Sequence, residues 1–176
     1  GRLAEPENII TYLDEFFSEG PLKGKTILIT SGPTIEDIDP VRFITNRSTG
    51  KMGYAIADEF AKAGAKVYLV SGPVNENISH SNITKIDVRS ASEMTDACLK
   101  YFPEVDGAIL AAAVADYTPT HISSSKIKKQ EGDMAIALKR TIDIAATIGK
   151  IKTDKQWTVG FALETENGIE NAKAKL

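Results

Sequence analysis

The chain has 176 residues, enough for one domain with a hydrophobic core, and its 42% hydrophobic and 26% charged residues are ordinary for a globular protein. A net charge of −3 gives no general reason to expect nucleic acid or an anionic membrane as a partner, and no apolar run approaches the roughly 20 residues that span a bilayer. The single cysteine excludes an internal disulfide framework and suits a reducing compartment, so we expect a cytoplasmic protein.

The first twenty residues differ in pattern from the rest of the chain. Pro6 stands at a helix start, and apolar residues follow at positions 9, 10, 13, 16 and 17. This spacing predicts an amphipathic helix, which ends before a hinge at Gly20-Pro21. The acidic residues in this stretch argue against a signal peptide.

Beyond the hinge, strand-length apolar runs alternate with helix-length periodic segments. We expect strands or strand-length runs at 25–32, 65–73, 86–88, 106–114, 134–138 and 157–163. We expect helices at 53–64, after the capping-box pattern Ser90–Glu93, near 142–151 and from about 168. The alternation predicts an α/β fold, a Rossmann-like doubly wound and mainly parallel sheet with helices on both faces.

Two of the predicted helices offer a candidate buried face. Met52, Ile56 and Phe60 are spaced four apart, so they share one side of the helix at 53–64. In the next helix Met94, Cys98 and Tyr101 share a side, and we therefore interpret Cys98 as a core residue.

A glycine-bearing loop precedes the helix at 53–64. Gly50 and Gly53 would let backbone N–H groups approach an anion at the helix start, and Lys51 adds a positive charge. A Walker A loop is excluded, because Thr45 stands where its first glycine belongs and Met52 replaces its Ser/Thr. A dinucleotide fingerprint is also missing after the first strand. The alternative, a glycine turn that only packs the helix on the sheet, stays open.

Candidate ligand contacts also follow the later strands. Asp116 ends an otherwise apolar strand, where a ligand hydroxyl or amine would satisfy its carboxylate. The polar stretch THISSS then precedes Lys126 and Lys128, which suggests a mobile flap whose two ammonium groups face one polyphosphate. A solvated lysine run is the alternative. Phe161, after the last strand, suits either a base or the core, and we find no residue spacing typical of a metal site.

Several long motifs in order resemble one enzyme family. SGPTIEDIDPVRFITNRSTGKMGYAIADEFAKAGAKVYLVSGPV, AAAVADY, KIKK and VGFALETEN are similar to phosphopantothenoylcysteine synthetases, also called phosphopantothenate–cysteine ligases. The resemblance runs from about Lys23 to Leu176. It implies that 1–20 is a linker helix following the flavin-dependent decarboxylase half of a bifunctional bacterial protein. It also implies that 21–176 is the ligase domain, cut short at its C-terminus.

The resemblance implies a two-step reaction. The carboxylate of phosphopantothenate attacks the α-phosphate of CTP, releasing pyrophosphate and leaving an acyl-cytidylate. The amine of cysteine then displaces CMP. Mg²⁺ accompanies the triphosphate, and the family works as a homodimer. For such a reaction the site must position the reactants and supply positive charge, and it needs no protein nucleophile.

The resemblance also implies residue roles. Asn46 would hold the acyl-cytidylate for attack by cysteine, and Lys126 would act on the nucleotide during acyl transfer. Arg42, in the stretch around the dimer interface, would bind the substrate, where one subunit approaches the substrate of the other. Gly50 and Gly53 would belong to the phosphopantothenate loop. The implied nucleotide site comprises Asp116, Lys126, Ile142, Asp143, Ile144, Ala145, Phe161 and Lys175. Ile142 departs from the proline expected there.

Two other hypotheses remain open. An NAD(P)-dependent oxidoreductase would share the sheet order, but it needs an acidic residue at the end of the second strand, where this chain has Ser71. A non-catalytic dimerisation fragment is the third possibility. The residues alone do not distinguish CTP from ATP.

Overall fold

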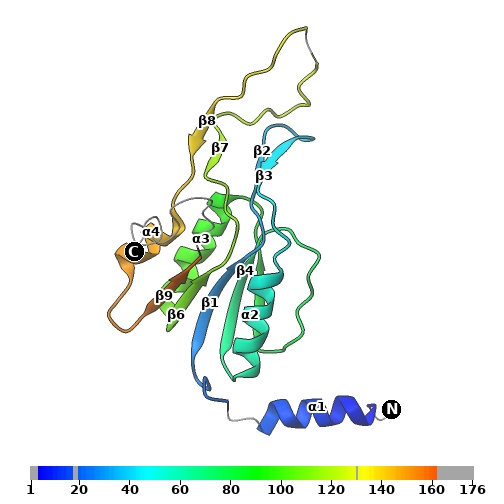
Figure 1. Ribbon diagram of the computed structural model, residues 1–176, viewed down its shortest axis with the longest axis vertical. Coiled ribbons are helices and arrows are strands. Elements are labelled where there is room, and N and C mark those ends of the chain that lie inside the picture. The colour runs from blue at the N-terminus through cyan, green and yellow to red at the C-terminus, as the bar shows by residue number, and fades with distance from the viewer. Residues whose placement is uncertain (1–3, 18–19, 130, 162–176) are drawn as a thin grey trace.

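The computed structural model describes residues 4–17, 20–129 and 131–161. Its centre is a five-stranded parallel sheet in the order β5-β4-β1-β6-β9 (Figure 1), which confirms the predicted doubly wound α/β fold. The sheet strands are β1 (Thr26–Ser31), β4 (Lys66–Ser71), β5 (Ile83–Asp87), β6 (Gly107–Leu110) and β9 (Trp157–Gly160). The helices are α1 (Pro6–Phe17), α2 (Lys51–Lys62), α3 (Ala91–Tyr101) and α4 (Ile144–Ile151), with a short 3-10 turn, η1 (Phe102–Glu104), after α3.

Alternating residues of β1 pack into two separate hydrophobic cores, one on each face of the sheet. Ile27 and Ile29 pack with α2 on one face of the sheet, whereas Leu28 packs with α3 and α4 on the other face. Successive side chains of a strand point to opposite faces, so a strand covered on both faces needs apolar residues on both, as Ile27, Leu28 and Ile29 provide. Cys98 is fully buried in the second core, as expected.

The buried face of α2 matches the predicted one only in part. Met52 is 48% exposed, and the buried residues of the helix are Gly53, Tyr54, Ala57 and Ala61. A Cβ at Gly53 would lie 2.4 Å from Ser31 Oγ, so the helix approaches β1 closely enough to require small residues there. The prediction was wrong for Met52, whereas Ile56 and Phe60 are partly buried and pack against the core on this face of the sheet. It missed the most buried positions because it followed side-chain size, whereas close helix–strand packing selects glycine and alanine.

Short paired segments project beyond the carboxyl edge of the sheet. β2 (Ile35–Asp37) and β3 (Phe43–Thr45) form an antiparallel hairpin, and β7 (Tyr117–Pro119) pairs with β8 (Leu138–Arg140). The loop that joins β7 to β8 extends away from the sheet at the top of Figure 1. We call β7, β8 and this loop, residues 120–137, the arm. Sequence periodicity missed these strands because three residues are too few to show it.

Other boundaries also moved. The third strand spans 83–87 instead of 86–88, and β6 ends at Leu110, short of the expected 114. The run at 134–138 is exposed, and strand pairing begins only at its last residue, Leu138. The predicted helix from about 168 lies outside the described residues. Helix α1 forms as predicted and lies at the end of the molecule opposite the arm (Figure 1). Within the described residues no helix has the length and apolarity to cross a membrane.

Candidate functional site

A cavity of about 690 Å³ opens where β6 and β9 end and α4 begins. Its lining includes Asp116, Ile142, Asp143, Ile144, Ala145 and Phe161, all predicted for the nucleotide from the resemblance, together with Arg140 and Thr141. Ligands of open α/β sheets bind outside the carboxyl ends of the strands, which is where this cavity lies. Segments that are far apart in the sequence therefore meet at one place.

The first turn of α4 presents backbone donors to this cavity. Asp143 caps the helix, accepting from the N–H of Ala146 at 2.9 Å. The N–H groups of Ile144 and Ala145 have no acceptor inside the helix, and with the helix dipole they favour an anion. The Ile144 side chain is 7% exposed and packs in the core, so a ligand contact at this residue would use its backbone.

The arm also lines this cavity, through Tyr117 of β7 and Arg140 of β8. The N–H of Thr141 donates to the Asp116 carbonyl at 2.9 Å, and its hydroxyl donates to the Ala115 carbonyl at 2.6 Å. These bonds fix the end of β8 beside the exposed Asp116. Sequence analysis missed Arg140, a cation that lines the cavity next to the α4 start. Its position directly before a predicted helix start was the available signal.

A second cavity, of about 450 Å³, lies at the start of α2. Its lining residues are Arg47, Ser48, Thr49, Gly50, Lys51, Met52, Gly53 and Ala111. Gly50 precedes the helix with φ = +78°, a left-handed conformation that favours glycine. Arg47 and Lys51 add positive charge to a helix start, which suits an anion. Gly53 also packs against Ser31, so the packing interpretation holds for this glycine, while the anion site stays a prediction.

Asn46 connects the segments that carry the two cavities. Its side-chain amide donates to the Val114 carbonyl at 2.9 Å, and it lies 3.5 Å from the Ala113 carbonyl. The loop before α2 is thereby tied to the segment that follows β6. The side chain itself is exposed, so a ligand can reach it.

Lys126 and Arg42 are not among the described residues that line either cavity. Lys126 is exposed on the arm, which extends away from the sheet in Figure 1, so the expected flap does not cover the site in this structure. Arg42 is bound to the arm, donating through Nη2 to the Ile127 carbonyl. Lys175 lies outside the described residues.

Two remaining observations bear on the chemistry. Within the described ranges, no group of three or more His, Cys, Asp or Glu residues is arranged to hold a metal ion. Burial raises the pKa of the Cys98 thiol to about 12, so this cysteine is not an available nucleophile.

Ser71, at the position where an oxidoreductase would place an acidic ribose ligand, is fully buried. Its hydroxyl donates to the Gly72 carbonyl and accepts from Tyr54. This environment counts against a dinucleotide site.

Comparison with known proteins gives a consistent result. Residues 22–176 match the family described as the DNA/pantothenate metabolism flavoprotein C-terminal domain. The whole chain is 48% identical to the coenzyme A biosynthesis bifunctional protein CoaBC of Bacillus subtilis (strain 168), covering 44% of that protein. It is also 54% identical to a protein of an unknown prokaryotic organism named cysteine/cysteine sulfinic acid decarboxylase, covering 50% of it. The chain thus spans about half the length of these curated relatives.

Solved structures share the fold. The crystal structure of the C-terminal domain of a CoaBC protein matches with a TM-score of 0.77 and 48% identity, over 88% of this chain and 72% of that one. A Cab2 variant in complex with phosphopantothenate-cysteine matches with a TM-score of 0.71 over 99% of this chain and 77% of that one. Its identity of 17% makes it evidence for the fold alone.

Proposed function

Because the chain belongs to the family of the DNA/pantothenate metabolism flavoprotein C-terminal domain, we propose that it is a CTP-dependent phosphopantothenate–cysteine ligase of coenzyme A biosynthesis. One observation carries the proposal furthest. Six residues that the resemblance assigns to the nucleotide, from three separate segments, line a single cavity at the carboxyl edge of the sheet. Identity of 48% to CoaBC over the entire chain supports the same assignment.

The proposed reaction has two steps. A carboxylate oxygen of phosphopantothenate attacks the α-phosphorus of CTP, and the bond to the β-phosphate oxygen breaks, so pyrophosphate leaves. The amine of cysteine then attacks the acyl carbon of the resulting acyl-cytidylate. CMP departs with the bonding electron pair, and the amine loses a proton to give the amide phosphopantothenoylcysteine. Activation turns a poor leaving group into a phosphate ester, so the site must chiefly position reactants and stabilise charge.

The chain's own groups suit these tasks. The start of α4 and Arg140 would bind triphosphate oxygens in the larger cavity. The start of α2, with Arg47 and Lys51, would hold the phosphate of phosphopantothenate in the smaller cavity. Asn46, bonded to the segment between the two, would orient the acyl group for attack by cysteine.

Mg²⁺ would neutralise the triphosphate and assist departure of pyrophosphate. Magnesium commonly binds through one or two carboxylates and substrate phosphates, and the larger cavity offers Asp116 as such a carboxylate. Asp143 is less suited, because it caps α4.

The proposal also includes partners and setting. A homodimer, with Lys126 of the arm reaching a nucleotide, follows from the family resemblance, and a cytoplasmic setting follows from the single cysteine. A decarboxylase half fused to this domain would account for a relative that carries a decarboxylase name and is twice as long. Residues 1–20, with α1, would then link the two halves.

The test is product formation from phosphopantothenate and cysteine with Mg²⁺ and either CTP, ATP or NADPH. We expect phosphopantothenoylcysteine and one pyrophosphate per product with CTP. Product formation with ATP and not with CTP would change the assigned nucleotide but leave the ligase assignment in place. Oxidation or binding of NADPH without ligation would contradict the proposal in favour of an oxidoreductase.

A further inference from the structure

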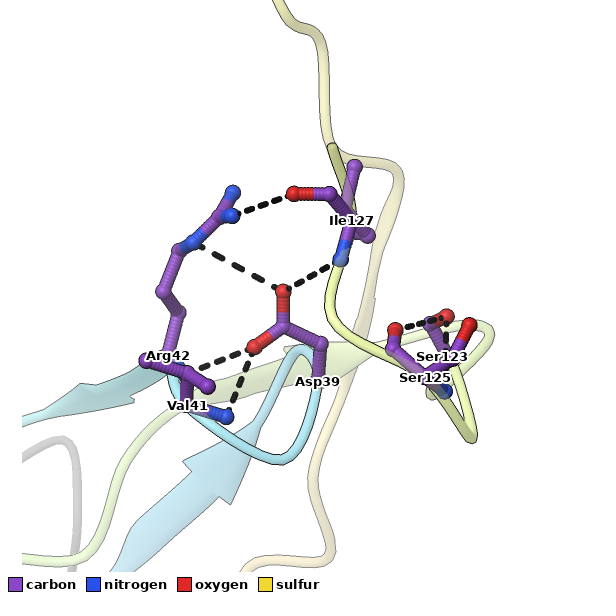
Figure 2. A network of polar contacts seen from close by, with 6 residues as sticks. All are labelled: Asp39, Val41, Arg42, Ser123, Ser125 and Ile127. Atoms are coloured by element: carbon purple, nitrogen blue, oxygen red, sulfur yellow. Dashed lines mark hydrogen bonds and ion pairs between the residues drawn. The ribbon is translucent and has the colours of Figure 1, made fainter. Parts of the chain in front are cut away.

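The turn between β2 and β3 is hydrogen-bonded to the arm at Ile127, the residue after Lys126. Figure 2 shows the Asp39 carboxylate between this turn and the backbone of Ile127. Oδ1 of Asp39 accepts from the N–H groups of Val41 and Arg42, each at 2.8 Å. Oδ2 accepts from the N–H of Ile127 at 3.1 Å and lies 3.6 Å from Arg42 Nε. All four contacts need an unprotonated oxygen.

The Ile127 peptide unit is held from both sides. Asp39 accepts from its N–H, and Arg42 donates to its carbonyl (Figure 2). A third bond, from the Ser123 N–H to the Ile38 carbonyl at 3.0 Å, attaches the arm just before Lys126. Lys126 therefore lies between two attachment points on the same turn, although its own side chain is exposed.

Asp39 is unusually placed for a surface turn, since its side chain is 0% exposed. Burial acts to raise the pKa of this carboxyl, but the N–H groups of Ile127, Val41 and Arg42 and the charge of Arg42 outweigh it, and the pKa is lowered. The carboxylate is thus ionised at neutral pH and fully committed to the turn and to the arm. A carboxylate needed only for the turn would require one oxygen.

We propose that Asp39 is a positioning residue for the ligase reaction, which fixes the Ile127 peptide so that the Lys126 ammonium is presented at a set point. The inference rests on the proposed function, because it assumes that Lys126 acts on the nucleotide. Arg42 then serves the same purpose from the carbonyl side of Ile127. This assignment differs from the direct substrate contact that the resemblance implies for Arg42.

The variant Asp39→Asn separates the two roles of the carboxylate, which are to stabilise the turn and to hold the arm. The amide keeps one acceptor oxygen and places an NH₂ donor at the other position. The turn uses its oxygen for two short bonds, so we expect the amide oxygen to stay there and the NH₂ to face the N–H of Ile127. The hairpin then persists while the attachment of the arm is lost.

The matched control is Asp37→Asn in the same hairpin. The Asp37 carboxylate accepts two hydrogen bonds from the Arg89 guanidinium, at 2.7 and 3.1 Å. Both bonds join the hairpin to Arg89, which is not part of the arm. The control removes a comparable charge and ion pair, so effects of altered hairpin charge or stability should show in it equally.

The first measurement is hydrogen exchange of individual amides in the purified protein, which does not depend on activity. We expect the Ile127 N–H to exchange about tenfold faster or more in Asp39→Asn than in the wild type or in Asp37→Asn. The amides of β1 and α2 should keep their wild-type rates. An Ile127 amide that is equally protected in Asp39→Asn would overturn the attachment.

The second measurement is a double-mutant cycle on pyrophosphate release with Lys126→Gln. Asp39→Asn alone should lower the rate about tenfold, and in the Lys126→Gln background it should change the rate less than about twofold. If Asp39→Asn caused only a structural defect, it would lower the rate of pyrophosphate release by the same factor in the wild-type and the Lys126→Gln backgrounds. That result would overturn the inference. Full activity of Asp39→Asn would do so as well.

The outcomes also separate this inference from the proposed function. If Lys126→Gln alone releases pyrophosphate at the wild-type rate, the inference fails and the ligase assignment stands. If the wild type releases no pyrophosphate from CTP, the proposed function fails and takes the inference with it.

Discussion

The carboxyl edge of the sheet and the arm beside it are held in place by different interactions. At the sheet edge, cavity-lining residues such as Ile144 and Gly53 belong to the hydrophobic core or touch it directly. In the arm, residues 131–140 are all exposed, and the neighbouring turn holds the loop through Asp39 and Arg42. Substitutions at the edge should therefore change stability or binding, whereas those at the arm should change activity with little effect on folding.

The largest effect is expected at Asn46, whose amide joins the loop before α2 to the segment after β6, and so connects the segments that line the two cavities. The variant Asn46→Asp replaces the NH₂ donor to the Val114 carbonyl with a second acceptor. We expect capture of the acyl-cytidylate by cysteine to fall about 100-fold or more, while its formation changes less than about threefold. Rapid-quench measurement of pyrophosphate and of product separates the steps.

The control for that variant is Asn82→Asp, at an exposed asparagine that lines a different cavity, with Lys25 and Lys66. It should leave both steps unchanged. Normal product formation by Asn46→Asp would show that the Asn46 amide has no role in the second step.

Gly53→Ala tests whether the edge depends on core packing. The added Cβ would lie 2.4 Å from Ser31 Oγ and 2.5 Å from Ser31 Cβ, so we expect a loss of about 1–3 kcal/mol in the free energy of unfolding. Gly149→Ala is the matched control, since its Cβ would meet nothing within 4 Å in α4. That variant should gain about 0.5–1 kcal/mol. Urea unfolding measures both, and equal stabilities would contradict the packing argument.

Arg140→Gln probes the wall that the arm contributes to the larger cavity. Loss of its charge should raise KM for CTP about tenfold while leaving the free energy of unfolding nearly unchanged, because the residue is exposed. Lys139→Gln, its neighbour in β8, removes the same charge from a residue outside the cavity lining. Similar KM values for the two variants would exclude a specific contact by Arg140.

The smallest effect concerns Cys98, for which we expect no reaction in the folded protein. With a pKa of about 12, its thiolate fraction at pH 8 is about one in ten thousand, and the side chain is inaccessible. A thiol reagent should modify it only after unfolding, at equal rates in the wild type and in Asp39→Asn. Faster modification in Asp39→Asn would show that the arm and the core are coupled.

The sequence predicted the fold best where one physical requirement dominated. The run at 25–32 was expected to be a strand, and β1 forms there with apolar residues facing both cores. Ser90 caps α3 by accepting from the N–H of Glu93 at 3.2 Å, as its motif indicates. The face of α2 was predicted only in part: Ile56 and Phe60 pack against the core, but the most buried positions hold small residues because the helix packs closely on Ser31. The hairpin was missed because its strands depend on distant bonds, such as that from the N–H of Ile35 to the Arg89 carbonyl at 2.7 Å.

The candidate site divides in the same way. Ile142 to Ala145 were expected at the nucleotide from the family resemblance, and they meet Asp116 and Phe161 because parallel strands end at one edge. Arg140 was missed, and Lys126 is not at the cavity, because their places depend on how the arm leaves the sheet. No local pattern encodes that path; contacts between residues 85 to 88 positions apart determine it.

The most direct test of the central claim omits cysteine. The purified protein is mixed with phosphopantothenate, CTP and Mg²⁺, and the products are identified by mass spectrometry. We expect the acyl-cytidylate and pyrophosphate, formed only when both substrates are present. Release of orthophosphate with CDP would contradict attack at the α-phosphate, and absence of any nucleotide-derived product would contradict the ligase assignment itself.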